Sequence, residues 1–548
     1  MMTNTPISLT NASPDTLPHH AMTGDADAAA AHPGKRNNAV VFGTHPLRIE
    51  DIVSLAKRTR PARLSDDPAW QARIRRGVEA LQAHLSAGRP VYGVTTGYGD
   101  ACVVEVPMAL IEALPAQLTR YHGCGMGEWL DDDAVRAVLA CRLASLSQGY
   151  SAVRPELLGA LTHLITHDIL PRIPAEGSVG ASGDLTPLSY VAATLIGERD
   201  VTFDGRLCAA TEALAATGGA PITLAPKEGL ALMNGTAVMT ALASLAFTRS
   251  RSLARLASRL TALATIALDG RAAHFHPTLF DAKPHAGQRD AARWIRDDLT
   301  GRVEPEEARL QDRYSLRCAP HVIGVLTDAL SWVRRDVENE INSANDNPLI
   351  DPDSGEVLHG GNFYGGHIAF AMDALKTAVA NIADLMDRQL ALLVDDKFNN
   401  GLPRNLSGAT GARAPINHGF KAVQIGASAW TAEALKHTMP ASVFSRSTES
   451  HNQDKVSMGT IAARDCLRVL TLTEQVAAAH TLAVAQAVAL RRRMSAHTSA
   501  LPETLATWLD AVAARSPFLD EDRALEHELR TVAAWLAEGG DLPDEHAL

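Results

Sequence analysis

Three small residues, Ala181-Ser182-Gly183, stand in a glycine-rich loop, GSVGASGDLTPLSY (177–190), that runs directly into apolar residues. A backbone amide can attack the carbonyl two residues before it only where the chain bends tightly and no side chain blocks the approach. Gly183 supplies such a nitrogen, and Ala181 leaves its carbonyl accessible. Compression by the surrounding fold would drive ring closure, and loss of the Ser182 hydroxyl as water would leave an exocyclic methylene. The loop therefore predicts an electrophile made from the chain alone, although the same tripeptide in isolation usually forms an ordinary turn.

A second glycine-rich loop, VYGVTTGYGD (91–100), carries Tyr92 at its head and Gly99 near its end. A loop of this composition can close over a pocket and bring a phenol into it, although an aromatic side chain that anchors a turn is the commoner arrangement. A tyrosinate can remove a proton from a β-carbon only where its surroundings lower the phenol pKa. Tyr92 is therefore a candidate base with a stated electrostatic requirement.

The segment QDRYSLRCAPHVIG (311–324) offers a cation that could hold a carboxylate. Tyr314 and Arg317 are three residues apart, so on a helical turn they share a face. The guanidinium of Arg317 can bind a carboxylate through two parallel hydrogen bonds. A surface ion pair is the plain alternative, but the residues around Arg317 in the sequence are largely apolar.

Together these segments resemble the histidine, phenylalanine and tyrosine ammonia-lyase family over nearly the whole chain after residue 38. The resemblance rests on GSVGASGDLTPLS and on several other separated motifs, including LALMNGT (230–236), NSANDNPLI (342–350) and HGGNFYGG (359–366). It implies the prosthetic group 4-methylidene-imidazol-5-one (MIO), formed from Ala181-Ser182-Gly183. It also implies a mainly α fold of fumarase/aspartase-like architecture, in which a long central helical bundle follows a smaller amino-terminal α+β domain that bears MIO.

The resemblance assigns roles to individual residues. Tyr92, at the head of a loop similar to the family's YGxxTGFG lid, is implied as the catalytic base. Arg317 is implied as the clamp for the α-carboxylate, and Tyr314 as an assistant near the methylidene. Tyr121 and His122, in RYHGCGMG (120–127), match the selectivity-loop positions that meet the substrate ring. The other implied substrate-binding residues are Gly99, Asn234, Gln311, Asn345, Phe363, Glu433, Asn452 and Gln453.

The implied reaction is the non-oxidative loss of ammonia from an aromatic L-amino acid, which gives a trans-arylacrylate. In this reaction the substrate amine adds to the methylidene derived from Ser182, Tyr92 takes a β-proton, and Arg317 holds the carboxylate. An aminomutase would use the same residues and return ammonia to the β-carbon. A fumarase/aspartase-type lyase would not need the tripeptide, and a non-catalytic relative would be expected to lack Tyr92, Ser182 or Arg317.

The substrate is harder to predict, because Tyr121-His122 differs from the family's usual pairs. Phenylalanine lyases usually carry Phe-Leu, some tyrosine lyases His-Leu, and histidine lyases Ser-His, a pair that some tyrosine lyases share. His122 could donate a hydrogen bond to a phenol oxygen or to an imidazole nitrogen. The segment HNQD (451–454) is closer to the phenylalanine/tyrosine branch than to the NQED of many histidine-degrading enzymes. The sequence therefore favours tyrosine, giving p-coumarate, with histidine, giving urocanate, as the alternative and phenylalanine or mixed use next.

Three parts of the chain must position these residues. Residues 1–38 show no apolar period and are predicted to form a disordered tail. Residues 39–240, with a short strand at 39–42 and helices alternating with glycine-rich loops, are predicted to form the MIO domain with its lid. Residues 241–548 are predicted to form the central bundle and the carboxy-terminal helices, because apolar residues recur at helical spacing. The expected long helices are 242–268, 321–342, 366–396, 420–437 and 459–494.

Composition narrows the partners. The chain has 548 residues, 46% of them hydrophobic, and a formal net charge of −11, which argues against nucleic acid. Six scattered cysteines without a CxxC pair indicate no disulfide framework and no thiolate zinc site, and we expect no bound metal and a cytoplasmic location. The uncharged stretch Gly229–Phe247 contains Asn, Gly, Thr and Ser, so it is predicted to be a buried helix and not a membrane span. By resemblance we expect a D2 homotetramer whose active sites each draw residues from three subunits.

Overall fold

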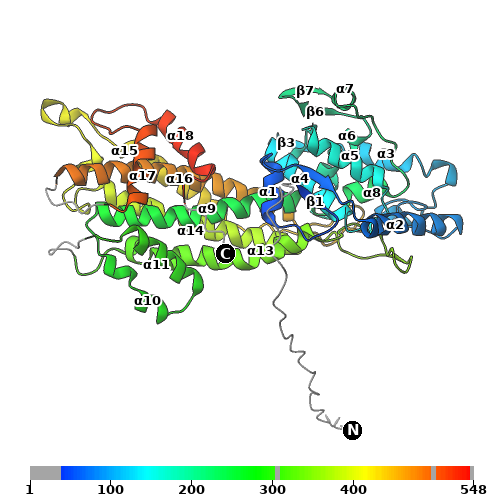
Figure 1. Cartoon of the computed structure of the whole chain (residues 1–548), viewed down its shortest axis with the longest axis horizontal. Helices are drawn as coiled ribbons and strands as arrows, with labels where there is room; N and C mark the ends of the chain where they lie inside the picture. Colours follow the sequence, from blue (N-terminus) through cyan, green and yellow to red (C-terminus); the bar gives the residue numbers. More distant parts are fainter. Residues whose placement is uncertain (1–38, 303–308, 495–500, 543–548) are drawn as a thin grey trace, which may run out of the picture. The chain divides into compact units, whose positions relative to one another are not determined.

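Four long helices form the centre of the fold: α9 (Ala237–Ala267), α13 (Ala319–Ile341), α14 (Gly366–Val394) and α16 (Gly459–Met494). They pack against one another and run side by side (Figure 1). The apolar residues that predict α14 from their spacing are all buried, namely Ile368, Met372, Leu375, Val379, Ile382, Met386, Leu390 and Leu393. Helix α16 is buried around most of its circumference, as expected of a helix in the middle of a bundle.

This computed structural model describes residues 39–302, 309–494 and 501–542. The described residues from Ala39 onward belong to one compact unit. The mainly α fold is confirmed, and each predicted long helix is present: 459–494 has the predicted bounds, and the ends of the others lie within five residues of those predicted. The predicted disordered tail, residues 1–38, lies outside the described residues. The division at residue 240 remains a prediction, and α9 runs across that position without a break.

Short helices and strands make up the amino-terminal part, which carries the lid and the tripeptide. The strand predicted at 39–42 is β1, which pairs in parallel with β2, and three small antiparallel sheets follow, β3 with β5, β4-β6-β7, and β8 with β9. The strands are β1 (Val40–Phe42), β2 (Ala62–Leu64), β3 (Met126–Trp129), β4 (Leu170–Pro171), β5 (Pro174–Glu176), β6 (Asp200–Phe203), β7 (Arg206–Ala209), β8 (Leu349–Ile350) and β9 (Val357–Leu358). The helices are α1 (Ile49–Ala56), α2 (Pro68–Ser86), η1 (Gly99–Val103), η2 (Met108–Leu110), α3 (Leu114–Tyr121), α4 (Asp132–Leu146), α5 (Pro155–Thr166), α6 (Leu185–Leu195), α7 (Ala210–Ala216) and α8 (Glu228–Met233).

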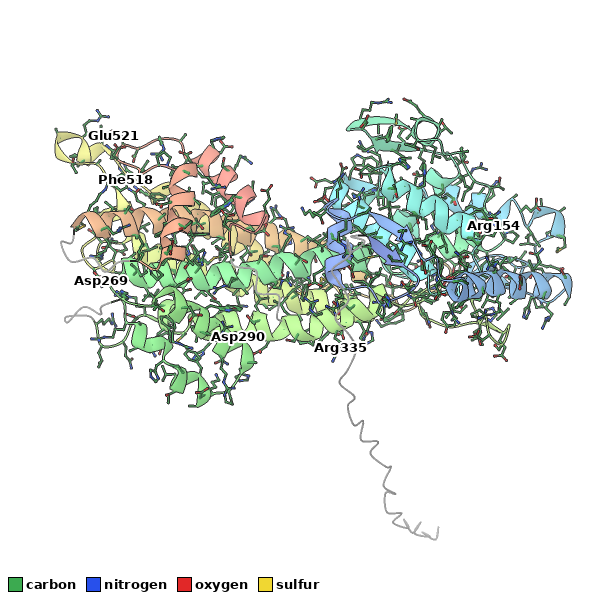
Figure 2. The ribbon with its side chains drawn as sticks, in the orientation of Figure 1. Arg154, Asp269, Asp290, Arg335, Phe518 and Glu521 are labelled. Carbon is green, nitrogen blue, oxygen red and sulfur yellow. The ribbon has the colours of Figure 1, made fainter. Side chains whose placement is uncertain are left out.

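Shorter helices surround the bundle. They are η3 (Ala272–Phe275), α10 (Pro277–Asp281), α11 (Ala286–Asp298), α12 (Tyr314–Arg317), η4 (Arg404–Leu406), η5 (Gly411–Ile416), α15 (Lys421–Lys436), α17 (Glu503–Arg515) and α18 (Glu526–Ala537). Asp269, labelled in Figure 2, follows the carboxy-terminal end of α9 and marks that end of the bundle. Helix α12 packs against α9, α13 and α14.

Side-chain caps fix where the helices near the site begin. Helix α4 starts after Asp131, whose carboxylate accepts a hydrogen bond from the backbone nitrogen of Ala134 at 2.8 Å. Helix α9 is capped from a distant part of the sequence, because the backbone nitrogens of Val238 and Met239 donate to Oδ2 of Asp184 at 3.1 and 3.0 Å. The four unpaired amides at a helix start favour a carboxylate there. Asp184 therefore ties the tripeptide loop to the first turn of α9.

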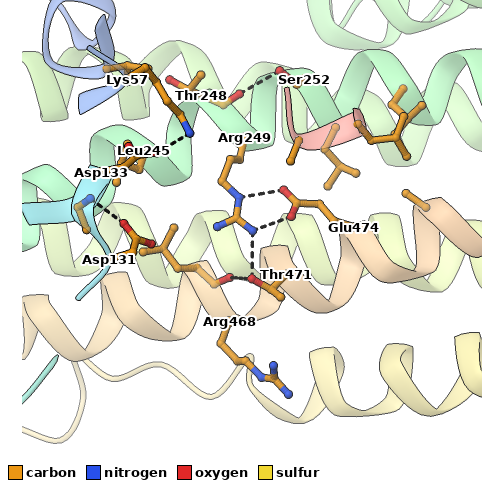
Figure 3. A pocket seen from close by; sticks show the side chains of 18 of the residues that line it. Lys57, Asp131, Asp133, Leu245, Thr248, Arg249, Ser252, Arg468, Thr471 and Glu474 are labelled. Carbon is orange, nitrogen blue, oxygen red and sulfur yellow. Dashed lines mark hydrogen bonds and ion pairs between the residues drawn. The ribbon is translucent and has the colours of Figure 1, made fainter. Parts of the chain in front are cut away.

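A cavity of about 430 Å³ beside α9 and α16 is lined by charged groups that bind one another (Figure 3). The Arg249 guanidinium donates to the carboxylate of Glu474 at 2.9 and 2.6 Å and to Thr471 at 3.0 Å. Lys57 donates to Asp133 at 2.6 Å. Because these charged groups are already paired with one another, they hold α1, α4, α9 and α16 together around the cavity.

No helix in the described ranges combines the length and the apolar character that crossing a membrane requires. The uncharged stretch Gly229–Phe247 is divided between α8 and α9 by the short segment Asn234–Thr236. Apart from the half-buried Leu245, its residues are buried in the fold. The prediction of a buried helical segment is therefore confirmed, with a break that brings Asn234 to the tripeptide loop.

Candidate active site

The backbone around Ala181-Ser182-Gly183 leaves the reacting atoms free and holds the atom between them. The Ser182 carbonyl accepts hydrogen bonds from Nδ2 of Asn234 at 2.7 Å and from the backbone nitrogen of Gly235 at 3.2 Å. Among the described residues, the Gly183 nitrogen and the Ala181 carbonyl have no hydrogen-bond partner. The nucleophile and the carbonyl required for ring closure are thus available, so the loop fits the implied prosthetic group.

Gly183 also allows a very close approach of two chain segments. Its φ is +71°, in the left-handed region, and a Cβ atom there would lie 2.1 Å from the carbonyl oxygen of Gly235. The next amide, that of Asp184, donates to that same oxygen at 2.8 Å. Glycine is therefore required at this position for packing, in addition to the open nitrogen that the sequence indicates.

Asp184 anchors this loop from below, a role that the sequence analysis did not assign. Its fully buried carboxylate accepts from Ser178 Oγ at 3.0 Å, from Thr460, and from the two amides at the start of α9. Burial raises the pKa of Asp184, whereas these hydrogen bonds lower it. The acid directly after Gly183 was the available signal, but its partners are distant in the sequence.

A second buried charge cluster lies behind the loop. The ammonium of Lys227 is 2.5 Å from Oδ2 of Asp346 and donates to the Ser151 carbonyl at 2.9 Å. Both charged side chains of this pair are completely buried. A buried ion pair of this kind holds the segment that carries Asn345 against the amino-terminal part.

The Ser182 hydroxyl faces a cavity of about 920 Å³. Gln453 donates to Oγ of Ser182 at 3.2 Å, and Thr448 donates to Oε1 of Gln453 at 2.8 Å. The cavity brings together ten of the predicted site residues: Tyr92, Gly99, Tyr121, His122, Ala181, Ser182, Asn234, Phe363, Asn452 and Gln453. Segments spread over more than 350 positions of the sequence therefore meet at one serine, as the resemblance implies.

The Tyr92 phenol is held on its own loop, where it accepts a hydrogen bond from the Gly99 nitrogen at 2.7 Å. Burial raises the pKa of Tyr92, the Gly99 hydrogen bond lowers it, and the nearby carboxylate of Glu449 raises it further. The net direction is upward, which is opposite to the lowered pKa that the sequence analysis requires of a base. Among the described residues of one chain, no cation offsets burial and Glu449 strongly enough to favour the tyrosinate.

The two residues of the predicted selectivity pair lie at the cavity with their rings in tilted contact. The ring centroids of Tyr121 and His122 are 4.5 Å apart. Burial lowers the pKa of His122 to about 4, so the imidazole is neutral at neutral pH and can either donate or accept a hydrogen bond. Burial, together with Tyr92 and Glu449, raises the pKa of Tyr121 to about 12.

Two predicted residues lie close to the cavity but do not line it. Gly183 is the buried residue of the tripeptide, as its backbone role requires. Asn345 was expected to line the pocket, but it is only 2% exposed and lies behind the loop. Its Oδ1 accepts from Arg142 at 3.2 Å and from Ser145 at 3.0 Å, so its polar groups are used within the core.

Gln311, Tyr314, Arg317 and Glu433 are not brought to this cavity. Arg317 donates to the Asp312 carbonyl at 3.0 Å and stacks on the exposed Tyr314 ring, 4.6 Å from its centroid. Glu433, on α15, binds Arg468 of α16. The predicted carboxylate clamp and three other predicted site residues therefore lie on the bundle in this chain.

The length of the bundle separates Arg317 from Ser182. Ser182 contacts Gly235, two residues before α9 begins, whereas Gln389 links Thr261 of α9 to the Ser315 carbonyl at 2.9 and 2.8 Å. Thr261 is 24 residues beyond Ala237, about 36 Å along the helix axis. No arginine side chain spans that distance, so Arg317 and Ser182 of one chain cannot bind the same small molecule.

Some cavity residues were not predicted: Tyr98, Cys102, Leu118, Leu185, Leu230, Asn347, His359, Gly360, Glu449, Asp454 and Lys455. Tyr98 occupies the position of phenylalanine in the lid motif, so its phenol was a visible departure. Glu449 accepts from the Asp100 nitrogen at 2.8 Å and joins the lid to the 445–457 segment. The contact between Glu449 and the lid could not be predicted, because the sequence does not show how the two loops meet.

In the described part of the chain no group of His, Cys, Asp and Glu could hold a metal ion, and all six cysteines are free.

Known proteins share this fold and sequence over nearly the full length. The sequence profile of the family described as aromatic amino acid lyase matches residues 47–511. A histidine ammonia-lyase of Aromatoleum aromaticum is 40% identical over 482 residues, covering 86% of this chain and 88% of the relative. A histidine ammonia-lyase of Gloeobacter violaceus is 37% identical over 497 residues, covering 90% and 95%.

Solved structures agree with these relatives. A tyrosine aminomutase from Streptomyces globisporus superposes with a TM-score of 0.85 at 35% identity, covering 91% of this chain and 97% of that one. A histidine ammonia-lyase from Trypanosoma cruzi gives a TM-score of 0.81 at 30% identity, covering 92% and 96%. The chain therefore belongs to the aromatic amino acid lyase family, as an ammonia-lyase.

Proposed function

We propose that this protein is an MIO-dependent lyase that removes ammonia from an aromatic L-amino acid without oxidation. The observation that carries the proposal is the tripeptide loop, in which the Gly183 nitrogen and the Ala181 carbonyl are free while the Ser182 carbonyl is held by two donors. Once formed from Ala181-Ser182-Gly183, MIO would supply an electrophilic methylidene for the substrate amine. The surrounding residues would then orient the substrate and move its β-proton.

The residues at the cavity support this division of labour. Gln453 contacts the Ser182 hydroxyl, so it lies beside the carbon that becomes the methylidene. Tyr92 opens onto the same cavity and is the proposed base for the β-proton. Its raised pKa in one chain means that a cation from outside this chain must favour the tyrosinate. Arg317 of a neighbouring subunit is the proposed source, because it would also hold the substrate carboxylate.

We propose L-histidine as the substrate, giving trans-urocanate. The two relatives described above are named histidine ammonia-lyase, and they cover most of this chain. A neutral His122 at the cavity can hydrogen-bond an imidazole nitrogen in either sense. The preference for tyrosine expected from Tyr121-His122 and HNQD is not supported by these relatives.

Tyrosine is the second candidate, either as a lyase substrate or as an aminomutase substrate. The tyrosine aminomutase structure matches the fold at 35% identity, and the phenols of Tyr98 and Tyr121 give the cavity polar groups that a phenol substrate could use. Phenylalanine offers no polar ring atom to these groups, so we place it last.

We further propose a cytoplasmic homotetramer with active sites shared between subunits. The separation of about 36 Å between the two halves of the predicted site supports the sharing. The exposed apolar side chains on the bundle and its loops, Val325, Phe370, Ile425 and Met439 among them, support burial against other subunits.

The test is to offer the purified protein L-histidine, L-tyrosine and L-phenylalanine separately and to follow arylacrylate absorbance and free ammonium. Chromatography for β-amino acids identifies an aminomutase. We expect urocanate and ammonium in equal amounts from histidine; product from tyrosine alone would replace the substrate proposal. Intact-mass spectrometry should show the wild-type chain lighter than its unmodified mass by two waters. Ser182→Ala cannot lose the second water, so its mass should not show the two-water deficit. This variant should fold normally and release no ammonia. An active wild-type chain of unmodified mass would refute the MIO proposal.

A further inference from the structure

Arg142, on α4, is a fully buried cation that lies behind the tripeptide loop. Its Nη1 donates to the Asn234 carbonyl at 3.1 Å and to Oδ1 of Asn345 at 3.2 Å, and its Nη2 donates to Ser145 at 3.3 Å. Within the described residues it forms no ion pair, and its Nε has no partner. Burial lowers the pKa of Arg142 to about 10, although the carboxylates of Asp346 and Asp184 raise it, so the side chain is charged at neutral pH. A buried cation that binds only neutral acceptors is costly, which calls for a function.

The Asn234–Gly235 peptide connects this cation to the loop. Its carbonyl accepts from Arg142, and its N–H donates to the Ser182 carbonyl at 3.2 Å. Hydrogen bonds in such a chain polarise one another, so a cation on the peptide oxygen strengthens the N–H as a donor. The contact needs a glycine, because a Cβ on Gly235 would lie 2.1 Å from Nη1 of Arg142.

The Ser182 carbonyl at the end of this chain becomes part of the predicted ring. The five ring atoms are the Ala181 carbonyl carbon, the Ser182 nitrogen, Cα and carbonyl carbon, and the Gly183 nitrogen. Ring closure forms the bond from the Gly183 nitrogen to the Ala181 carbon and a C=N bond to the Ser182 nitrogen. The Ala181 oxygen leaves as water with one hydrogen from each nitrogen. A second water leaves as the Ser182 Cα–H hydrogen and hydroxyl, which forms the Cα=Cβ bond.

Loss of the Cα hydrogen places developing negative charge on the Ser182 carbonyl oxygen. Donors already aimed at that oxygen stabilise this charge without rearranging. Two such donors are present, the Asn234 amide directly and the Gly235 N–H, and only the second is linked to a cation. The charge of Arg142 therefore acts on the loss of the second water through one peptide group.

We propose that Arg142 is a positioning residue for formation of the prosthetic group, because it polarises the Asn234–Gly235 peptide that binds the Ser182 carbonyl. The inference rests on the proposed MIO chemistry, and it assigns to a buried arginine a role beyond packing. Asn345 and Ser145 hold the guanidinium in place but form no hydrogen bond to the Asn234–Gly235 peptide. Substitutions at these two residues can therefore test the charge of Arg142 without removing its side chain.

The test changes the charge while leaving Arg142 in place. Asn345→Asp puts a carboxylate against Nη1 and neutralises the guanidinium, whereas Asn345→Ala removes the same acceptor without adding charge. Both lose the bond from Asn345 Nδ2 to Thr236, so they form a matched pair. Ser145→Ala removes the Nη2 contact and the Ser145 hydrogen bond to Asn345 without changing any charge, so it serves as a further control. After a translation block, intact mass reports the fraction of chains lacking two waters over time, and circular dichroism and size exclusion confirm the folded state.

We expect the ring to form about tenfold more slowly in Asn345→Asp than in Asn345→Ala, with Ser145→Ala close to wild type. Equal rates in folded Asn345→Asp and Asn345→Ala would overturn the role of Arg142. If Asn345→Asp is insoluble, the same measurement on Arg142→Met decides, because an apolar replacement of similar size for a buried charge is often tolerated; ring formation at the wild-type rate there overturns the proposal. A wild-type chain without the two-water deficit would instead refute MIO itself.

Discussion

Two inactive variants of this chain should restore activity when they share one assembly. Ser182→Ala removes the source of the methylidene, and Arg317→Met removes the proposed carboxylate clamp. In one chain these residues lie toward opposite ends of α9, whose axis rises by about 36 Å between Ala237 and Thr261. Each variant alone destroys every site in its own oligomer. In a mixed oligomer, some sites take Ser182 from one variant and Arg317 from the other.

The recovered activity has a calculable size. If the two variants mix randomly in equal amounts, half of the sites receive an intact Ser182 and half of these receive an intact Arg317 from a different chain. About one quarter of the sites are then complete, so we expect about one quarter of the wild-type activity per subunit. If both residues served a site from the same chain, no complete site could form and the recovered activity would be zero.

The assay uses two chains with different affinity tags, co-expressed and purified over both tags so that only mixed oligomers remain. Initial rates of ammonium release are compared with each variant purified alone and with separately purified variants combined without exchange. Mixed oligomers as inactive as the single variants would refute the argument from helix length. A double variant with both changes in one chain, co-expressed with wild type, controls for the effect of mixing.

Three further predictions follow from buried or charged groups. Lys227→Met leaves the Asp346 carboxylate buried without its cation, so the free energy of unfolding in urea should fall by about 3–5 kcal/mol. The double variant Lys227→Met/Asp346→Leu should recover most of this loss. A single variant as stable as wild type would contradict the ion-pair argument. Because Tyr92 must lose its proton to act as the base, kcat/KM of the assembled enzyme should rise with pH through the pKa of this phenol, which burial raises within one chain and the neighbouring subunit's cation is proposed to lower. A profile that is flat from acid to alkaline pH would argue against Tyr92 as the base. Arg334 and Arg251 lower the pKa of Glu50 to about 2 from its usual 4.5. The stability that this carboxylate contributes is therefore present above pH 4.5 and is lost as pH falls toward 2. Glu50→Gln should remove that part of the acid dependence in melting curves.

The bundle was predictable because its helices carry a regular apolar spacing. The positions from Ile368 to Leu393 follow helical steps, and all of them are buried along α14. The break after α8 was less visible, since Asn234 stands within an uncharged stretch that reads as one helix. Only its contact with the Ser182 carbonyl explains why an amide interrupts that stretch.

The chemistry of the tripeptide was predictable from residue types, but its supports were not. Gly183 was identified from the room that a reacting nitrogen needs, whereas its contact with Gly235 depends on a segment more than 50 residues away. Arg142 carries no local signal, because a charged residue within an apolar stretch can equally be paired, exposed or buried, and the partners of Asp184 are distant in the sequence. The upward shift of the Tyr92 pKa depends on burial and on Glu449, which the sequence does not place near the lid.

The break between α8 and α9 has a consequence for engineering this scaffold. Asn234 and Gly235 contact the tripeptide only because α9 starts two residues later, with its first amides bound to Asp184. Adding or deleting a single residue between 233 and 237 would rotate α9 by about 100° about its axis or displace that peptide. This linker should therefore tolerate neither a change of length nor the loss of Asn234 or Gly235, and libraries that vary loop lengths should leave it untouched.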